Sequence, residues 1–123
     1  MNISILKVAI TENLDSYKIR YDRALEKVIK NPVGALEFGW TTELAVLKQV
    51  VDNFTNMSNA IAELDGLPDN MCKDNIARCT SRIIQTSQPH EKEAHKIMCN
   101  FWFNVAVRLR EDLGDFASLR WAF

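Results

Sequence analysis

A run of eleven residues, 97–107, constrains the fold of this chain more than any other feature. Nine of the eleven are apolar, and the two exceptions, Asn100 and Asn104, lie four residues apart. Because a helix turns about 100° per residue, both amides would lie on one stripe that Arg108 continues. A helix that is apolar on its other sides must be surrounded, either by its own bundle or by a second copy of the chain.

Proline and glycine divide the rest of the chain into segments of helix length. The three prolines are at positions 32, 68 and 89, and the four glycines are at positions 34, 39, 66 and 114. Between them, apolar residues recur at steps of three and four, which is typical of amphipathic helices. The pattern predicts an all-α fold: one domain over residues 1–123, built as a compact antiparallel bundle of four to five helices.

The first predicted helix starts at residue 3 and ends before Asn31-Pro32. Residues 3–10 alone would also suit a strand, since isoleucine and valine favour strands. A helix of 28 residues is about 42 Å long, whereas a domain of this size has a radius of gyration of about 14 Å. We therefore expect this helix to bend, to break near residues 11–13, or to overhang and pair with a second chain.

The other boundaries follow from capping residues. Thr41 is the expected N-cap of a helix that runs to about residue 64, and Asp69 is the expected N-cap of the next. Pro89 suits the first turn of a helix ending near residue 113, with Gly114 as its C-cap. A short terminal helix follows. The third helix is expected to turn four residues inward, namely Cys72, Ile76, Cys79 and Ile83.

The connector 33–40 is expected to form about one helical turn. It carries Leu36, Phe38 and Trp40, and we expect these side chains to pin it to the core.

Composition narrows the class of protein. The chain has 15 basic and 16 acidic residues and a net charge of −1, so nucleic acid is not an expected partner. Its three cysteines form no CxxC motif, which is typical of a reducing compartment. With neither a signal peptide nor a membrane-spanning run, the sequence predicts a soluble, cytoplasmic protein.

One helix face carries the preferred candidate binding site. Arg78 and Arg82 lie four apart, and two such cations repel each other unless an acidic group lies between them. With Ser81 and Gln85, they could bind an acidic partner or a phosphate-bearing ligand. A solvated surface is the alternative interpretation.

A metal site has only weak candidates. Glu91, His95 and Cys99 are spaced four apart, as metal ligands on a helix can be. The alternative is a charged first turn that leads to a buried cysteine, so no metal and no cofactor are predicted.

Two further sites would serve association with other chains. Asn100, Phe101, Asn104 and Arg108 are the predicted self-association face, because an amide pair across a two-fold axis can fix the register of a dimer. In a monomer, the two amides would instead line a small polar cavity or face water. The aromatic residues Trp121 and Phe123 form a candidate C-terminal anchor, which either docks on the core or is offered to a partner.

No catalytic residues are predicted, because no nucleophile elbow or phosphate-binding loop is present. The leading hypothesis is a small interaction protein that binds a partner protein as an adaptor or inhibitor, and that forms a homodimer. The first alternative is a helical bundle that binds a phosphate-bearing or nucleotide-like anion. A metal-dependent hydrolase is the second alternative, although the chain contains no Glu-x-x-Glu pair to hold magnesium.

Overall fold

The computed structural model describes residues 3–121. It is 84% helical, and no strand occurs within those residues, so the all-α prediction is confirmed. Residues 3–10 belong to a helix and not to a strand. The elements are α1 (Ile3–Lys30), α2 (Pro32–Glu37), α3 (Trp40–Ile61), α4 (Met71–Gln85), α5 (Pro89–Leu109) and the 3-10 helix η1 (Gly114–Trp121).

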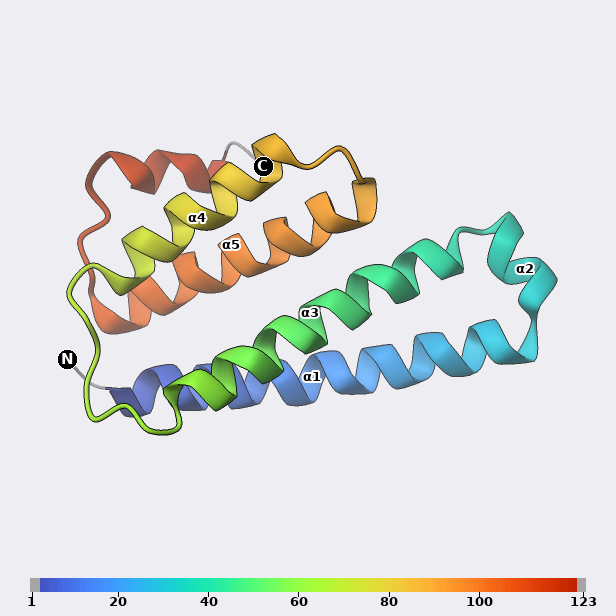
Figure 1. Cartoon of the computed structure of the whole chain (residues 1–123), viewed down its shortest axis with the longest axis horizontal. Coiled ribbons are helices and arrows are strands. Elements are labelled where there is room, and N and C mark those ends of the chain that lie inside the picture. Colours follow the sequence, from blue (N-terminus) through green and yellow to red (C-terminus); the bar gives the residue numbers. More distant parts are fainter. Residues whose placement is uncertain (1–2, 122–123) are drawn as a thin grey trace.

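The helices form two antiparallel hairpins (Figure 1). α1 and α3 make the first hairpin, with α2 at its turn, and α4 and α5 make the second. α5 packs against both α1 and α3, so it joins the hairpins. The backbones of α3 and α4 both lie close to α5 but not to each other. A groove can therefore form between them, over α5.

The apolar run of α5 is surrounded by its own chain. Phe101, Trp102 and Phe103 are all buried, although they point in three directions. The rings of Phe101 and Phe54 meet edge to face with centroids 4.9 Å apart, and Trp102 packs 5.1 Å from Phe101. Most of the apolar excess of α5 is thus buried within the chain, whereas Val107 is 66% exposed.

α1 runs for 28 residues and does not break near residues 11–13. Its far end overhangs the rest of the molecule. Figure 1 shows the α1–α3 hairpin extending well past the α4–α5 hairpin, with α2 at the far end. The buried part of α1 is confined mainly to its first half, at Leu6, Ala9 and Ile10. The far half of α1 packs only on α2 and α3, because α4 and α5 do not reach it.

Several predicted helix ends were wrong. α3 begins at Trp40 and not after Thr41, because Gly39 adopts a left-handed conformation (φ 71°) that ends the turn before it. α5 ends at Leu109, where Arg110 is left-handed (φ 55°) and its N–H donates to the carbonyls of Ala106 and Val107. Gly114 is not its C-cap and begins η1 instead.

The start of α4 is capped by a residue far along the chain. Asp69 is not the N-cap; Asn70 occupies that place in a left-handed conformation, and its side chain makes no capping bond. The Glu111 carboxylate instead accepts hydrogen bonds from the N–H groups of Cys72 (3.1 Å) and Lys73 (2.7 Å). A negative charge at a helix N-terminus is stabilising, so Glu111 ties the end of α5 to the start of α4.

The four predicted inward residues of α4, Cys72, Ile76, Cys79 and Ile83, are all buried. Among residues 3–121, no helix combines the length and the apolar character needed to cross a membrane.

Candidate functional site

The predicted arginine face borders a polar pocket between α3, α4 and α5, which we name the arginine pocket. α3 and α4 form its walls, and a stripe of α5 forms its floor. Its volume is about 310 Å³. Its lining residues are Asn53, Asn56 and Met57 from α3, Asn75, Arg78, Cys79 and Arg82 from α4, and His95, Met98 and Trp102 from α5.

Helical spacing explains why these side chains meet. Each wall contributes residues three or four apart, which lie on one side of their helix. The structure therefore places Arg78 and Arg82 together, as predicted from the sequence. Ser81 and Gln85 are exposed and do not line the pocket, so the predicted set is only partly assembled.

The arginine pocket carries positive charge without a balancing carboxylate. No Asp or Glu lines it, and within residues 3–121 no carboxylate forms an ion pair with Arg78 or Arg82. Partial burial lowers the pKa of His95, and the nearby Arg82 lowers it further, against a smaller opposing effect of Glu91. His95 is therefore mainly neutral near pH 7 and can donate or accept one hydrogen bond at each ring nitrogen.

The thiol of Cys79 on the pocket wall is not a ready nucleophile. Burial raises its pKa to about 11, and the two arginines only partly offset that rise. Because the thiolate is the reactive form, the thiol is inert at neutral pH.

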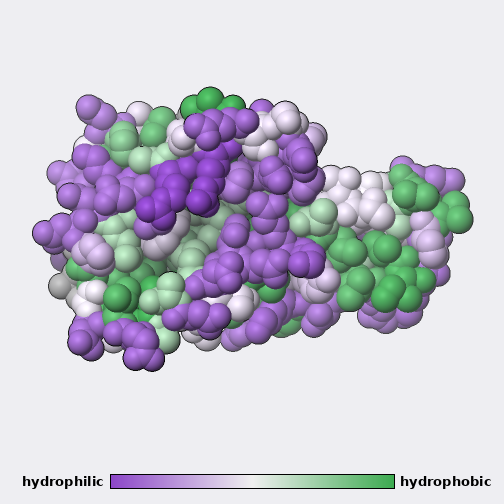
Figure 2. All heavy atoms as spheres, in the orientation of Figure 1, coloured by the Kyte–Doolittle hydropathy of each residue, from purple (hydrophilic) through white to green (hydrophobic). Residues whose placement is uncertain are grey.

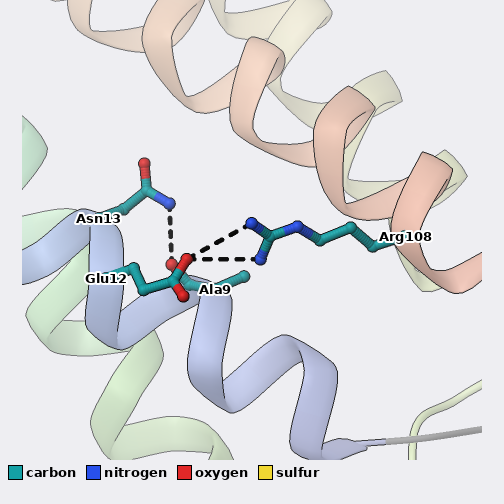
Figure 3. A network of polar contacts seen from close by, with 4 residues as sticks. All are labelled: Ala9, Glu12, Asn13 and Arg108. Carbon is teal, nitrogen blue, oxygen red and sulfur yellow. Dashed lines mark hydrogen bonds and ion pairs between the residues drawn. The ribbon is translucent and has the colours of Figure 1, made fainter.

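The predicted self-association face divides into buried and exposed parts. Phe101 is in the core, whereas Asn100 and Asn104 are exposed. Arg108 reaches from α5 to Glu12 on α1, with its Nη1 and Nη2 atoms 3.5 and 3.4 Å from the carboxylate (Figure 3). Next to this pair, Asn13 donates to the carbonyl of Ala9 at 2.8 Å.

Asn104 is also engaged within the chain. Its Oδ1 accepts a hydrogen bond from Arg120 at 3.2 Å, and both residues line a hollow of about 410 Å³ between α1, α5 and η1. Asn104 thus lines a polar hollow, whereas Asn100 is exposed and does not line it.

The weak metal candidates do not converge. The Glu91 carboxylate accepts a hydrogen bond from Thr86 Oγ1 at 2.7 Å, and Cys99 is buried beside Thr80. Across the described part of the chain, no three His, Cys, Asp or Glu side chains gather closely enough to hold a metal ion.

The C-terminal anchor is described only in part. Trp121 at the end of η1 is 83% exposed and is not docked on the core. The other half of the prediction, Phe123, lies outside the described residues.

The sequence did not predict an apolar surface at the far end of the first hairpin. Four large side chains there have exposed fractions of 67% to 77%, and we call them the apolar tip: Ile29, Val33, Leu36 and Phe38. In Figure 2, hydrophobic atoms gather at the protruding end of the molecule, where Figure 1 places α2. The expectation that Leu36 and Phe38 pin the connector to the core was wrong, because both side chains are exposed and the buried residues of α2 are Gly34 and Ala35.

The conformation of the apolar tip is fixed by local contacts. The Asn31 Oδ1 caps α2 by accepting from the N–H of Gly34 at 2.9 Å, and Pro32 suits the first turn. The Phe38 ring packs 5.6 Å from Trp40, and the Lys27 ammonium lies 4.2 Å above the Trp40 ring. These contacts order the start of α2 and the Phe38 ring at the turn.

Comparison of the chain with protein-family models, with curated proteins and with solved structures found no match.

Proposed function

We propose that this protein acts by binding a partner protein, as an adaptor or an inhibitor, through its apolar tip. The observation that carries the proposal is the exposure of Ile29, Val33, Leu36 and Phe38 together at one protruding end. Single exposed apolar residues are ordinary, but a contiguous apolar patch is typical of a protein interaction site. In this proposal the chain is a binding protein and not an enzyme.

The shape of the tip favours a concave partner. It is a short helix at the end of a hairpin, so it can enter a groove in the way that recognition helices do. Large apolar and aromatic side chains such as Leu36 and Phe38 would be the anchors, since a few such residues carry most of the energy of an interface.

The two lysines beside the tip are paired within the chain. Lys30 pairs with Glu26 at 2.6 Å, and Lys27 lies 4.0 Å from Glu43. A partner therefore need not supply a strong charge of either sign, and recognition depends mainly on apolar contact. Because the local contacts of Asn31 and Trp40 already order the tip, binding loses less conformational entropy than it would with a disordered loop.

Self-association stays a prediction, and it is separate from the binding of a partner protein by the tip. Since α5 is covered by its own chain, a homodimer would have to use exposed surface, such as the stripe of Asn100 and Arg108. We propose that the apolar tip binds a different protein and not a second copy of this chain. Light scattering over a concentration series measures the oligomeric state directly.

We also propose a cytoplasmic location. Its support is that Cys72, Cys79 and Cys99 are all free, which suits a reducing compartment. Cell fractionation of the native protein tests this proposal.

The partner can be tested by site-specific photo-crosslinking in the native host. A photoreactive residue at position 36 or 38 should capture the same protein, and one at the exposed Asn59, at the other end of α3, should not. The captured protein is then purified and its binding to the unlabelled chain is measured by calorimetry.

Two matched variants decide the outcome. Leu36→Ser should weaken binding of the purified partner by about 10-fold or more, since hot-spot truncations cost at least 1–2 kcal/mol. Ile84→Ser is the control, because Ile84 is 72% exposed on α4, far from the tip. Equal binding by the wild type and Leu36→Ser, or capture of a second copy only, would overturn the proposal.

A further inference from the structure

We propose that the arginine pocket binds a small phosphate-bearing molecule, with its phosphoryl group held between Arg78 and Arg82. This site is independent of the apolar tip: the tip projects from the α1–α3 hairpin, and the pocket lies where α3 and α4 flank α5.

The pocket face of α4 carries positive charge that no carboxylate balances. Two guanidinium groups four residues apart on a helix repel each other. Elsewhere in the described chain, Arg108 is relieved by Glu12 on a neighbouring helix, but Arg78 and Arg82 have no such carboxylate. A bound anion would supply the missing charge, and guanidinium groups bind phosphate oxygens in a paired, directional way.

The opposite wall of the pocket supplies neutral hydrogen-bond donors. Asn53 and Asn56 on α3 face the same pocket, and no hydrogen bond within residues 3–121 engages their side-chain amides. Asn75 differs, because its amide nitrogen already donates to the carbonyl of Met71 at 2.8 Å. Two charged and two neutral donor groups on facing walls suit the three terminal oxygens of a phosphomonoester better than the two oxygens of a carboxylate.

The size and the apolar lining of the pocket also suit an organic phosphate. Its 310 Å³ is at the lower end of the range of about 300–1,000 Å³ for small-molecule sites. Met98 and Trp102 on the floor, with Met57 on the α3 wall, place apolar surface beside the charged groups. A site of this kind fits a phosphate with a small organic body, and it is larger than bare phosphate needs.

Calorimetry on the unmodified chain tests the proposal with paired probes. Glycerol 3-phosphate and AMP are compared with glycerol and adenosine, which lack the phosphate. At least one phosphate ester should bind saturably, while its parent compound should not. Inorganic phosphate and acetate complete the set.

Variants assign the binding to the pocket. Arg78→Gln and Arg82→Gln should each weaken binding of the ester by about 10- to 100-fold, as expected for the loss of a charge-assisted contact. Arg23→Gln, an exposed arginine on α1, removes the same charge elsewhere and should leave binding unchanged. Because Arg78 and Arg82 are exposed, the variants should keep the wild-type melting temperature without ligand.

A spectroscopic readout supports the same assignment. Trp102 lines the pocket, so in a Trp40→Phe/Trp121→Phe background its fluorescence should change on ester binding. The proposal is overturned if no phosphate ester binds, if the Arg78 and Arg82 variants bind as the wild type does, or if acetate competes equally. Binding of inorganic phosphate as tight as that of both esters would overturn the organic part of the assignment.

Discussion

The base of the α1–α3 hairpin and its far end, where α2 forms the turn, differ in whether their apolar side chains are buried. At the base, α5 covers the hairpin, and Leu6, Ile10 and Phe54 are buried completely or almost so. At the far end, α5 is absent, and Leu36 and Phe38 are exposed. Whether an apolar side chain of this hairpin contributes to stability therefore depends on whether α5 covers it. The side chains of the tip, which α5 does not cover, are available for binding.

The largest expected effect compares one phenylalanine at each end. Phe54→Ala should lower the free energy of unfolding by about 3–5 kcal/mol, because Phe54 is fully buried against Tyr17 and Phe101. Phe38→Ala should change it by no more than about 0.5 kcal/mol, as surface substitutions do. Denaturant unfolding measures both variants, and equal losses would break the comparison.

Helix capping gives the next largest effect and contrasts a distant cap with a local one. Glu111→Ala should destabilise the protein by about 1–2 kcal/mol, since it removes both acceptors from the start of α4. Glu63→Ala removes the same charge from an exposed position just after α3 and serves as control. Thermal unfolding of the two variants should differ; a shared melting temperature would refute the role of Glu111.

The local cap at the tip should matter less to overall stability. A Cβ at Gly34 would lie 2.6 Å from the Asn31 Nδ2 and 2.9 Å from its Cγ, so Gly34→Ala must push the cap aside. We expect a loss of about 0.5–1 kcal/mol and faster hydrogen exchange of the α2 amides. Gly66→Ala is the matched control, because nothing lies within 4 Å of its Cβ position. Unchanged exchange in α2 would show that the cap does not order the tip.

The smallest expected effect is a pH dependence of the free energy of unfolding, which comes from His95 on α5. Burial and Arg82 lower the pKa of His95, so the unfolded chain takes up a proton at a higher pH than the folded chain. The contribution of His95 to stability is therefore full above its unfolded pKa of about 6.5 and falls as the pH drops through that value. The charged groups around it are Arg78 and Arg82 on α4 and Glu91 on α5, while α3 offers only neutral amides.

Melting curves between pH 7.5 and 5.5 test this sign. The wild type should lose slightly more stability over this interval than His95→Gln does. A wild type that gains stability relative to His95→Gln on acidification would contradict it.

The sequence predicted the helices because their signals are local. Steps of three and four between apolar residues, with proline and glycine between segments, gave the all-α fold. They also gave the inward face of α4 from Cys72 to Ile83. The same spacing predicts that Arg78 and Arg82 lie on one face of their helix.

What the sequence could not predict depends on distant contacts. The cap of α4 comes from Glu111. Its carboxylate accepts from the N–H groups of two residues that lie 39 and 38 positions earlier in the chain. The arginine pocket exists because α3 and α4 both pack on α5 while their own backbones stay apart. The exposure of Leu36 follows from the overhang of the first hairpin, and apolar periodicity does not encode it.

The distribution of cysteine has a practical consequence. Cys72 and Cys79 lie on α4 and Cys99 on α5, so within the chain every thiol belongs to the second hairpin. All three are buried, and burial raises the pKa of each of them. Their rate of reaction with a thiol reagent in native buffer therefore reports how often the second hairpin opens, and it requires no introduced label.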